Sequence, residues 1–248
     1  MRTILCSLAL VGSVFTAATT PKPAPKATPK PTVASTTPKP ATTPAPKPAA
    51  TPVPKATPIP KPPPAEPSEA IKQALAAMQK NDLATAKTGL EAVLAKEPEN
   101  AAALLNLGII AYRQKRPDDA ESLLTQALHH DTESAQGWLV LGVVRLDQDR
   151  LDAALAALAQ AAFLDPKNPR AHHYLGVAIG RKGWYSGAED EMRKAIELQP
   201  DYAEAHYNLA VFYLQRTPPA IELARRHYQK ALDLGAAPDP DLAKQLGN

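Results

Sequence analysis

The six histidines are the side chains of this sequence best suited to bind a metal ion. They fall as two adjacent pairs, His129-His130 and His172-His173, and two single residues, His206 and His227. Imidazole is a common zinc ligand, and His173 and His206 could approach each other across adjacent helices. Neighbouring residues of a helix, however, point about 100° apart, so each pair offers at most one inward ligand. The pattern therefore favours packing or surface histidines, and we expect no metal ion or other cofactor.

Runs of charged residues are the other candidates for chemistry. Glu189-Asp190-Glu191 places three carboxyl groups together, but the run lies near the expected start of a helix, where the helix dipole favours acids. Lys115-Arg116 and Arg225-Arg226 are short basic pairs, typical of solvated helix faces rather than of phosphate contacts. No Gly-rich phosphate loop, nucleophile elbow or metalloprotease motif occurs in the sequence. We therefore predict no catalytic residue, no enzyme activity and no nucleic-acid partner.

Charge and proline divide the chain into two parts. Residues 1–66 hold eight Lys and Arg against one Glu, a net charge of +7, whereas the other 20 basic and 24 acidic residues give residues 67–248 a net charge of −4. Of the 27 prolines, 18 lie between Pro21 and Pro67. The single cysteine, Cys6, excludes a disulfide framework. Because Ala and Leu dominate the apolar residues and only 5% of residues are aromatic, we expect an all-α domain after a tail.

The start of the chain has the features of a secretory signal. Arg2 supplies a positive start, residues 4–15 form an apolar run, and Thr16-Ala17-Ala18 places small side chains before a cleavage site. The run is shorter than the roughly 20 apolar residues that a membrane span needs, although a retained membrane anchor is the alternative. We predict a signal peptide at residues 1–18 and a secreted or periplasmic protein of the bacterial cell envelope.

Residues 19–66 consist mainly of Pro, Lys, Thr and Ala. Proline removes backbone donors and the lysines repel one another, so we predict a disordered, extended spacer. At ~3.1 Å per residue this spacer could reach at most about 150 Å. The segment resembles the Pro-Lys spacers of bacterial envelope proteins. Its lysines could contact an anionic envelope polymer, or the spacer could be a solubilising tether without a partner.

The rest of the chain repeats itself every 34 residues. Each unit has the pattern of two helices joined by a polar turn, which in the third unit are residues 135–148 and 151–164. A single pair of helices cannot cover its apolar faces, whereas a stack of pairs can, so the repeat predicts a solenoid. A small residue recurs where the two helices should approach each other most closely. It is found at Ala86, Ala120, Ala154 and Ala188.

This pattern resembles the tetratricopeptide repeat (TPR). The match is fullest in the third unit, at Trp138, Leu141, Gly142, Ala154, Ala161 and Pro166. His172 and His206 depart from the pattern, because they stand where a bulky residue is expected. The resemblance implies a superhelical solenoid of five helix-turn-helix units with a C-terminal capping helix. The expected units are 67–100, 101–134, 135–168, 169–202 and 203–238, with the cap at 239–248.

The resemblance further implies that the first helices of the units line a concave groove that binds a ligand. Most side chains at the family's ligand-facing places are aliphatic here, which suits an amphipathic helix or an extended apolar segment. The alternative is that these side chains are buried between neighbouring first helices, or covered by the tail of the protein. The predicted peptide-binding residues are Leu105, Ile109, Tyr112, Gln136, Leu139, Val143, Leu146, Arg170, His173, Val177, Tyr207 and Val211.

These observations together predict a non-enzymatic adaptor that binds a protein or peptide in the groove by shape and apolar complementarity. The alternative is a passive structural or assembly scaffold of the envelope, which would use the convex face or the ends of the stack. Substitutions in the groove separate the two, because only the adaptor should lose its partner.

Overall fold

The computed structural model describes residues 68–247, and all regular structure in this range is α-helical, which confirms the predicted all-α class. The predicted signal peptide and spacer, residues 1–66, lie outside the described residues. Between residues 68 and 247, no helix combines the length and the apolar character that crossing a membrane requires. The helices are α1 (Glu69–Gln79), α2 (Leu83–Leu94), α3 (Ala101–Arg113), α4 (Pro117–His130), α5 (Ala135–Asp147), α6 (Leu151–Leu164), α7 (Pro169–Arg181), α8 (Tyr185–Leu198), α9 (Ala203–Gln215), α10 (Ile221–Asp233) and α11 (Pro240–Gln245).

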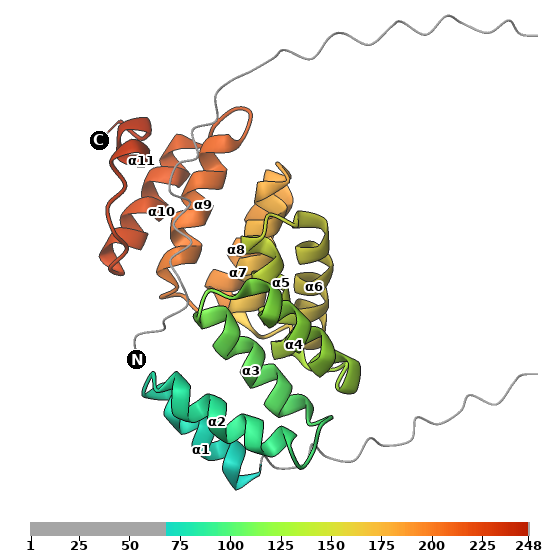
Figure 1. Cartoon of the computed structure of the whole chain (residues 1–248). Coiled ribbons are helices and arrows are strands. Elements are labelled where there is room, and N and C mark those ends of the chain that lie inside the picture. The colour runs from blue at the N-terminus through green and yellow to red at the C-terminus, as the bar shows by residue number, and fades with distance from the viewer. Residues whose placement is uncertain (1–67, 248) are drawn as a thin grey trace, which may run out of the picture. The chain divides into compact units, whose positions relative to one another are not determined.

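Helices α1 to α10 form five consecutive pairs (Figure 1). Within this series each helix contacts the one before it and the one after it, and the first helix of each unit also contacts the first helix of the next. This arrangement is a helical repeat solenoid, in which each unit covers the apolar face of its neighbour. The short helix α11 closes the last unit, because Leu242 and Leu246 are buried in the same core cluster as Ala224 and Tyr228 of α10.

The starts of the first helices recur with the repeat. Asn100, Ser134 and Asn168 are spaced 34 residues apart, and each side-chain oxygen accepts a hydrogen bond from a backbone N–H of the first turn, at 2.9 to 3.2 Å. These caps satisfy amide groups that have no partner inside the helix. The turn inside each unit places one residue in the left-handed region of the backbone. These residues are Asn81, Lys115, Asp149 and Gly183.

The core lies between the two helices of each unit. The alanines that recur every 34 residues are fully buried, and so are the large side chains four residues after them, Leu90, Leu124, Leu158 and Met192. In the third unit the contact is so close that a Cβ at Gly142 would lie 2.5 Å from Cγ of Leu158. Small residues at these places therefore allow the helices to approach each other.

Candidate functional site

The first helices α1, α3, α5, α7 and α9 carry all the binding residues that the sequence predicts, and we call the surface they form the first-helix face. Seven of the twelve predicted residues are partly or fully exposed there. They are Leu105, Ile109, Tyr112, Gln136, Arg170, Tyr207 and Val211.

The other five predicted residues are buried, so the expectation that they line an open groove is wrong. Their exposed fractions lie between 1% and 6%. The reason is the direct contact between successive first helices, which share these side chains. Between α7 and α9 the approach is closest where Phe212 packs over Gly180, since a Cβ at Gly180 would overlap the ring. The buried residues are Leu139, Val143, Leu146, His173 and Val177.

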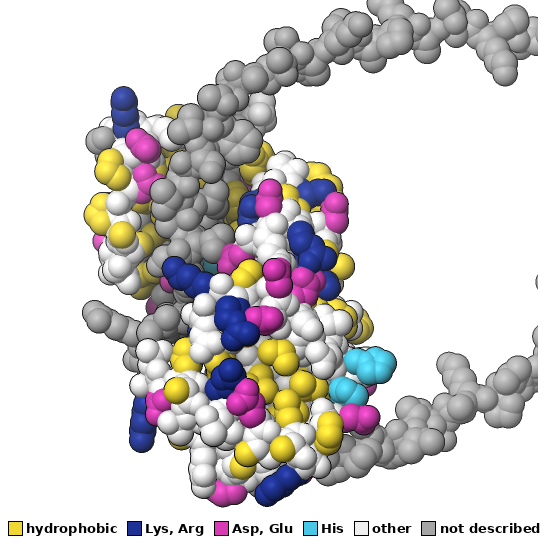
Figure 2. All heavy atoms as spheres, viewed as in Figure 1, with side chains coloured by type: hydrophobic (Ala, Val, Ile, Leu, Met, Phe, Trp, Pro, Cys, Tyr) yellow, Lys and Arg dark blue, Asp and Glu magenta, His cyan; other side chains and the backbone are white. Residues whose placement is uncertain are grey.

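Open apolar surface remains on α1 and α3. Leu75, Leu105, Ile109 and Tyr112 are all half-buried, and we call these four residues the N-terminal apolar patch. Seen from one side, hydrophobic side chains gather over α3 and the neighbouring α4, with charged side chains of both signs around them (Figure 2).

A polar contact borders the N-terminal apolar patch. The Tyr112 hydroxyl donates a hydrogen bond to the Asp147 carboxylate of α5. Burial raises the pKa of Asp147, while this hydrogen bond and the positive charge of Arg181 oppose the rise. Arg181 also donates a hydrogen bond to the backbone carbonyl of Leu146, at 2.8 Å. The contacts fix one edge of the patch and join α3, α5 and α7.

The two histidines that depart from the TPR pattern perform the same structural role as Trp138. Trp138 Nε1, His172 Nε2 and His206 Nε2 each donate to the backbone carbonyl six residues earlier, at 2.9, 3.0 and 3.2 Å respectively. All three residues occupy the same place in successive units, and each ring N–H bonds the end of the preceding unit. The 34-residue spacing of His172 and His206 from Trp138 is a signal that could have revealed this role from the sequence.

His173 and His206 do not pair with each other, contrary to the approach that the sequence suggested. The Asn208 amide donates to His173 Nε2 at 2.9 Å, so Nδ1 carries the proton and donates to the Tyr202 hydroxyl, 3.1 Å away. Burial lowers the pKa of His173 to about 3, so the ring is neutral at pH 7. Within residues 68–247, no three His, Cys, Asp or Glu side chains are grouped so that they could hold a metal ion.

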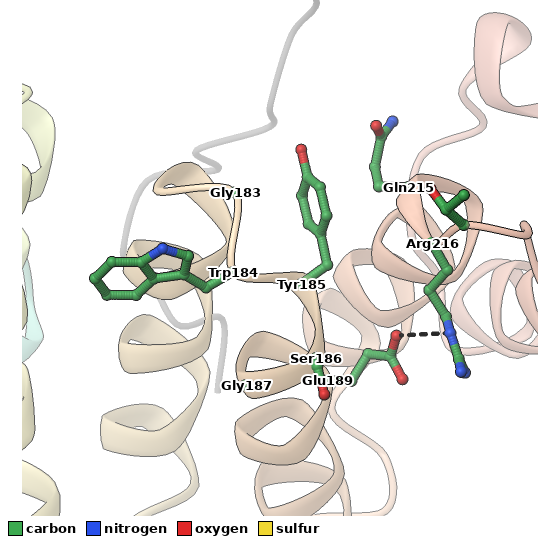
Figure 3. Close-up of a pocket in the computed structure, with 9 residues that line it drawn as sticks. Gly183, Trp184, Tyr185, Ser186, Gly187, Glu189, Gln215 and Arg216 are labelled. Atoms are coloured by element: carbon green, nitrogen blue, oxygen red, sulfur yellow. Dashed lines mark ion pairs between the residues drawn. The ribbon is translucent and has the colours of Figure 1, made fainter. Parts of the chain in front are cut away.

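A second hollow, of ≈ 460 Å³, lies between the start of α8 and the end of α9 (Figure 3). Trp184, which is 57% exposed, and Tyr185 form part of its wall. Glu189 is buried beneath it, with its carboxylate 3.5 Å from Arg216 Nε and 3.2 Å from Arg193 Nη2. The acidic run is therefore not explained by the helix dipole, as the sequence had suggested, because Glu189 forms ion pairs with these two arginines. Sequence reasoning also missed the exposed Trp184.

Comparison with known proteins agrees with the repeat architecture. Three tetratricopeptide repeat models match residues 71–136, 111–178 and 191–233. The chain is 26% identical to MamA, over 65% of this chain and 93% of that one, with a TM-score of 0.57. No curated protein sequence matches significantly.

Two further solved structures share the fold. One is pilF of Pseudomonas aeruginosa, at 21% identity over 71% of this chain and 82% of that one, with a TM-score of 0.64. The other is YrrB, described as a TPR protein with an unusual peptide-binding site, at 24% identity over 72% and 90%, with a TM-score of 0.58. Identities this low establish the common fold alone.

Proposed function

Since this chain belongs to the tetratricopeptide repeat family, whose members bind protein or peptide partners, we propose that it is a non-enzymatic adaptor that binds a peptide or helix on its first-helix face. The observation that carries this proposal is the N-terminal apolar patch, where Leu75, Leu105, Ile109 and Tyr112 keep part of their surface in contact with solvent. The equivalent aliphatic side chains of α5 are buried.

The chemistry of the patch favours an apolar partner segment. Aliphatic side chains on two neighbouring helices offer a surface into which the apolar face of an amphipathic helix can pack, and Tyr112 adds an aromatic ring. Residues that are already half-buried lose little conformational freedom when a partner covers them. The polar edge at Asp147 limits the patch on one side and gives the partner a direction.

Replacing Ile109 with Glu should weaken partner binding more than tenfold, a loss of more than about 1.4 kcal/mol. The carboxylate would lose its water in the complex without gaining a partner, whereas in the free protein it can turn toward solvent. The partner is first crosslinked in envelope extracts, and its recovery is then compared between variants. Thr125→Glu adds the same charge at an exposed place on α4 and should leave recovery unchanged. Circular dichroism confirms that both variants are folded.

The competing role, a passive scaffold, draws support from the second helices. Phe163 on α6 is 78% exposed, which gives that side of the stack an apolar contact point of its own. Phe163→Ser is therefore included in the same experiment. If Ile109→Glu retains the partner and Phe163→Ser loses it, the adaptor role fails and the scaffold role takes its place.

We also propose that the protein acts outside the cytoplasm, in the periplasm or beyond. The apolar run of residues 4–15 and the small residues Thr16-Ala17-Ala18 support this proposal. The mature protein should then begin at or near Thr19, which intact-mass measurement of envelope material can determine. A full-length species found only in the cytoplasm would contradict it.

A further inference from the structure

A pocket of ≈ 380 Å³ in the last unit is lined by two histidines and two basic residues. His206 of α9 and His227 of α10 meet with their Nδ1 atoms 2.9 Å apart. Arg226 and Lys230 line the same pocket and form no ion pair with any other described residue. From the sequence alone, Arg225-Arg226 belongs to the solvated surface, but the structure places Arg226 beside two imidazole rings.

Hydrogen bonding fixes where the protons of the histidine pair lie. His206 Nε2 faces the backbone carbonyl of Pro200 at 3.2 Å, and a carbonyl can only accept, so Nε2 carries the proton. In the neutral His206 ring Nδ1 is then an acceptor, and His227 Nδ1 must donate to it. His227 Nε2 is consequently left as an unprotonated nitrogen, and it forms no hydrogen bond with a described residue.

The fourth unit shows what the fifth unit lacks. His172 holds the same place as His206, and its Nδ1 lies 2.7 Å from the Glu191 carboxylate, while its Nε2 donates to a carbonyl in the same way. Allowing for the two extra residues of the fifth unit, His227 stands where the fourth unit has Glu191. The fifth unit has thus replaced an internal anion with a second histidine.

The charges around this histidine pair are mostly positive. Arg193 of α8, although paired with Glu189 and Asp190, and Arg226 of α10 act on His227, and Lys230 acts on His206. Tyr213 of α9 lies against His227, with ring centroids 5.6 Å apart. The acidic side chain of the pocket lining, Asp233, already accepts a hydrogen bond from Gln229.

We propose that this pocket binds a tetrahedral oxyanion, a sulfate or phosphate group, and that His227 takes up a proton at Nε2 when the anion binds. The protonated His227 would donate from Nδ1 to His206 and from Nε2 to the anion, so the histidine pair keeps its hydrogen bond. Arg226 can offer two parallel donors to such a group, and Lys230 adds a compact positive charge.

Proton uptake gives the binding a definite dependence on pH. Burial, and then the positive charges of His206, Arg226 and Arg193, lower the pKa of His227 to about 4 in the free protein. An anion at Nε2 stabilises the protonated ring and raises this pKa. The affinity for the anion should therefore rise as the pH falls through the pKa of the bound state, by up to about tenfold per pH unit, and level off near pH 4.

The test is to measure the titration of His227 by NMR in the 15N-labelled full chain, with sulfate as the probe. Sulfate keeps its charge between pH 4 and pH 7.5, on the order of two negative charges throughout, so any pH dependence belongs to the protein. At constant ionic strength, replacing chloride with sulfate should raise the pKa of His227 by about one unit or more. The variant Arg226→Gln/Lys230→Gln should lose at least about nine-tenths of the sulfate affinity, that is, tenfold.

Two controls decide between a site and a general salt effect. Lys244→Gln removes an exposed positive charge of α11, outside the pocket lining, and should leave the sulfate response unchanged. His227→Gln should still fold, as judged by circular dichroism, and should bind sulfate with an affinity that no longer depends on pH. The proposal is overturned if sulfate and chloride give the same His227 titration, or if the double variant responds to sulfate as the unaltered chain does.

Discussion

Replacing Gly142 with Ala should lower the free energy of unfolding by about 2–3 kcal/mol, although alanine is the better helix former. The added Cβ would lie 2.5 Å from Cγ of Leu158, 2.7 Å from its Cδ2 and 3.2 Å from its backbone N. Leu158 is fully buried in α6, so it has no free volume into which it could move. The two helices of the third unit must therefore separate, which disturbs contacts with the neighbouring units. Urea denaturation followed by circular dichroism measures the loss.

Gly89 offers the matched control for this change. It is also a helical glycine, on α2, but a Cβ there would meet its nearest neighbour, Cβ of Ala74, at the ordinary contact distance of 3.8 Å. Gly89→Ala should therefore stabilise the protein by about 0.5–1 kcal/mol, through reduced backbone entropy in the unfolded chain. If both variants lose stability equally, close helix packing is not the reason for glycine at position 142.

The architecture of residues 68–247 could be predicted because its causes are local and repeated. Ala154 and its equivalents must be small where two helices of one unit meet, and Leu158 and its equivalents must fill the space beside them. These demands depend on residues that lie fewer than about 34 positions apart, so each unit states them again. Helices α5 and α6 accordingly begin at the residues that the sequence predicts, Ala135 and Leu151.

The accessibility of the first-helix face could not be predicted in the same way, because it depends on how closely successive units approach. Phe212 of α9 packs over Gly180 of α7, and this contact between two particular residues belongs to no family pattern. The pairing of His206 with His227 was also missed, although an alignment of the units would have placed His227 opposite Glu191 once the two extra residues were allowed for. In both cases the decisive residue departs from the repeat.

Replacing Val143 with Glu should cost about 4 kcal/mol or more of folding stability, the largest loss expected from any single substitution considered. Val143 is 3% exposed and belongs to the core cluster that joins the third, fourth and fifth units. A carboxylate there would either lie unpaired in apolar surroundings or become protonated, and each outcome favours the unfolded state. The effect should appear as a lowered midpoint in thermal denaturation.

Gln136 provides the comparison on the same helix. It is exposed at the start of α5, so Gln136→Glu should change stability by no more than about 0.5 kcal/mol. Ile109→Glu should lie between the two, because Ile109 holds the place equivalent to Val143 but remains half-buried. A Val143→Glu variant as stable as Gln136→Glu would mean that the first helices of the third and fourth units separate in solution. The whole face would then be open to a partner, and the binding surface would extend well beyond the N-terminal apolar patch.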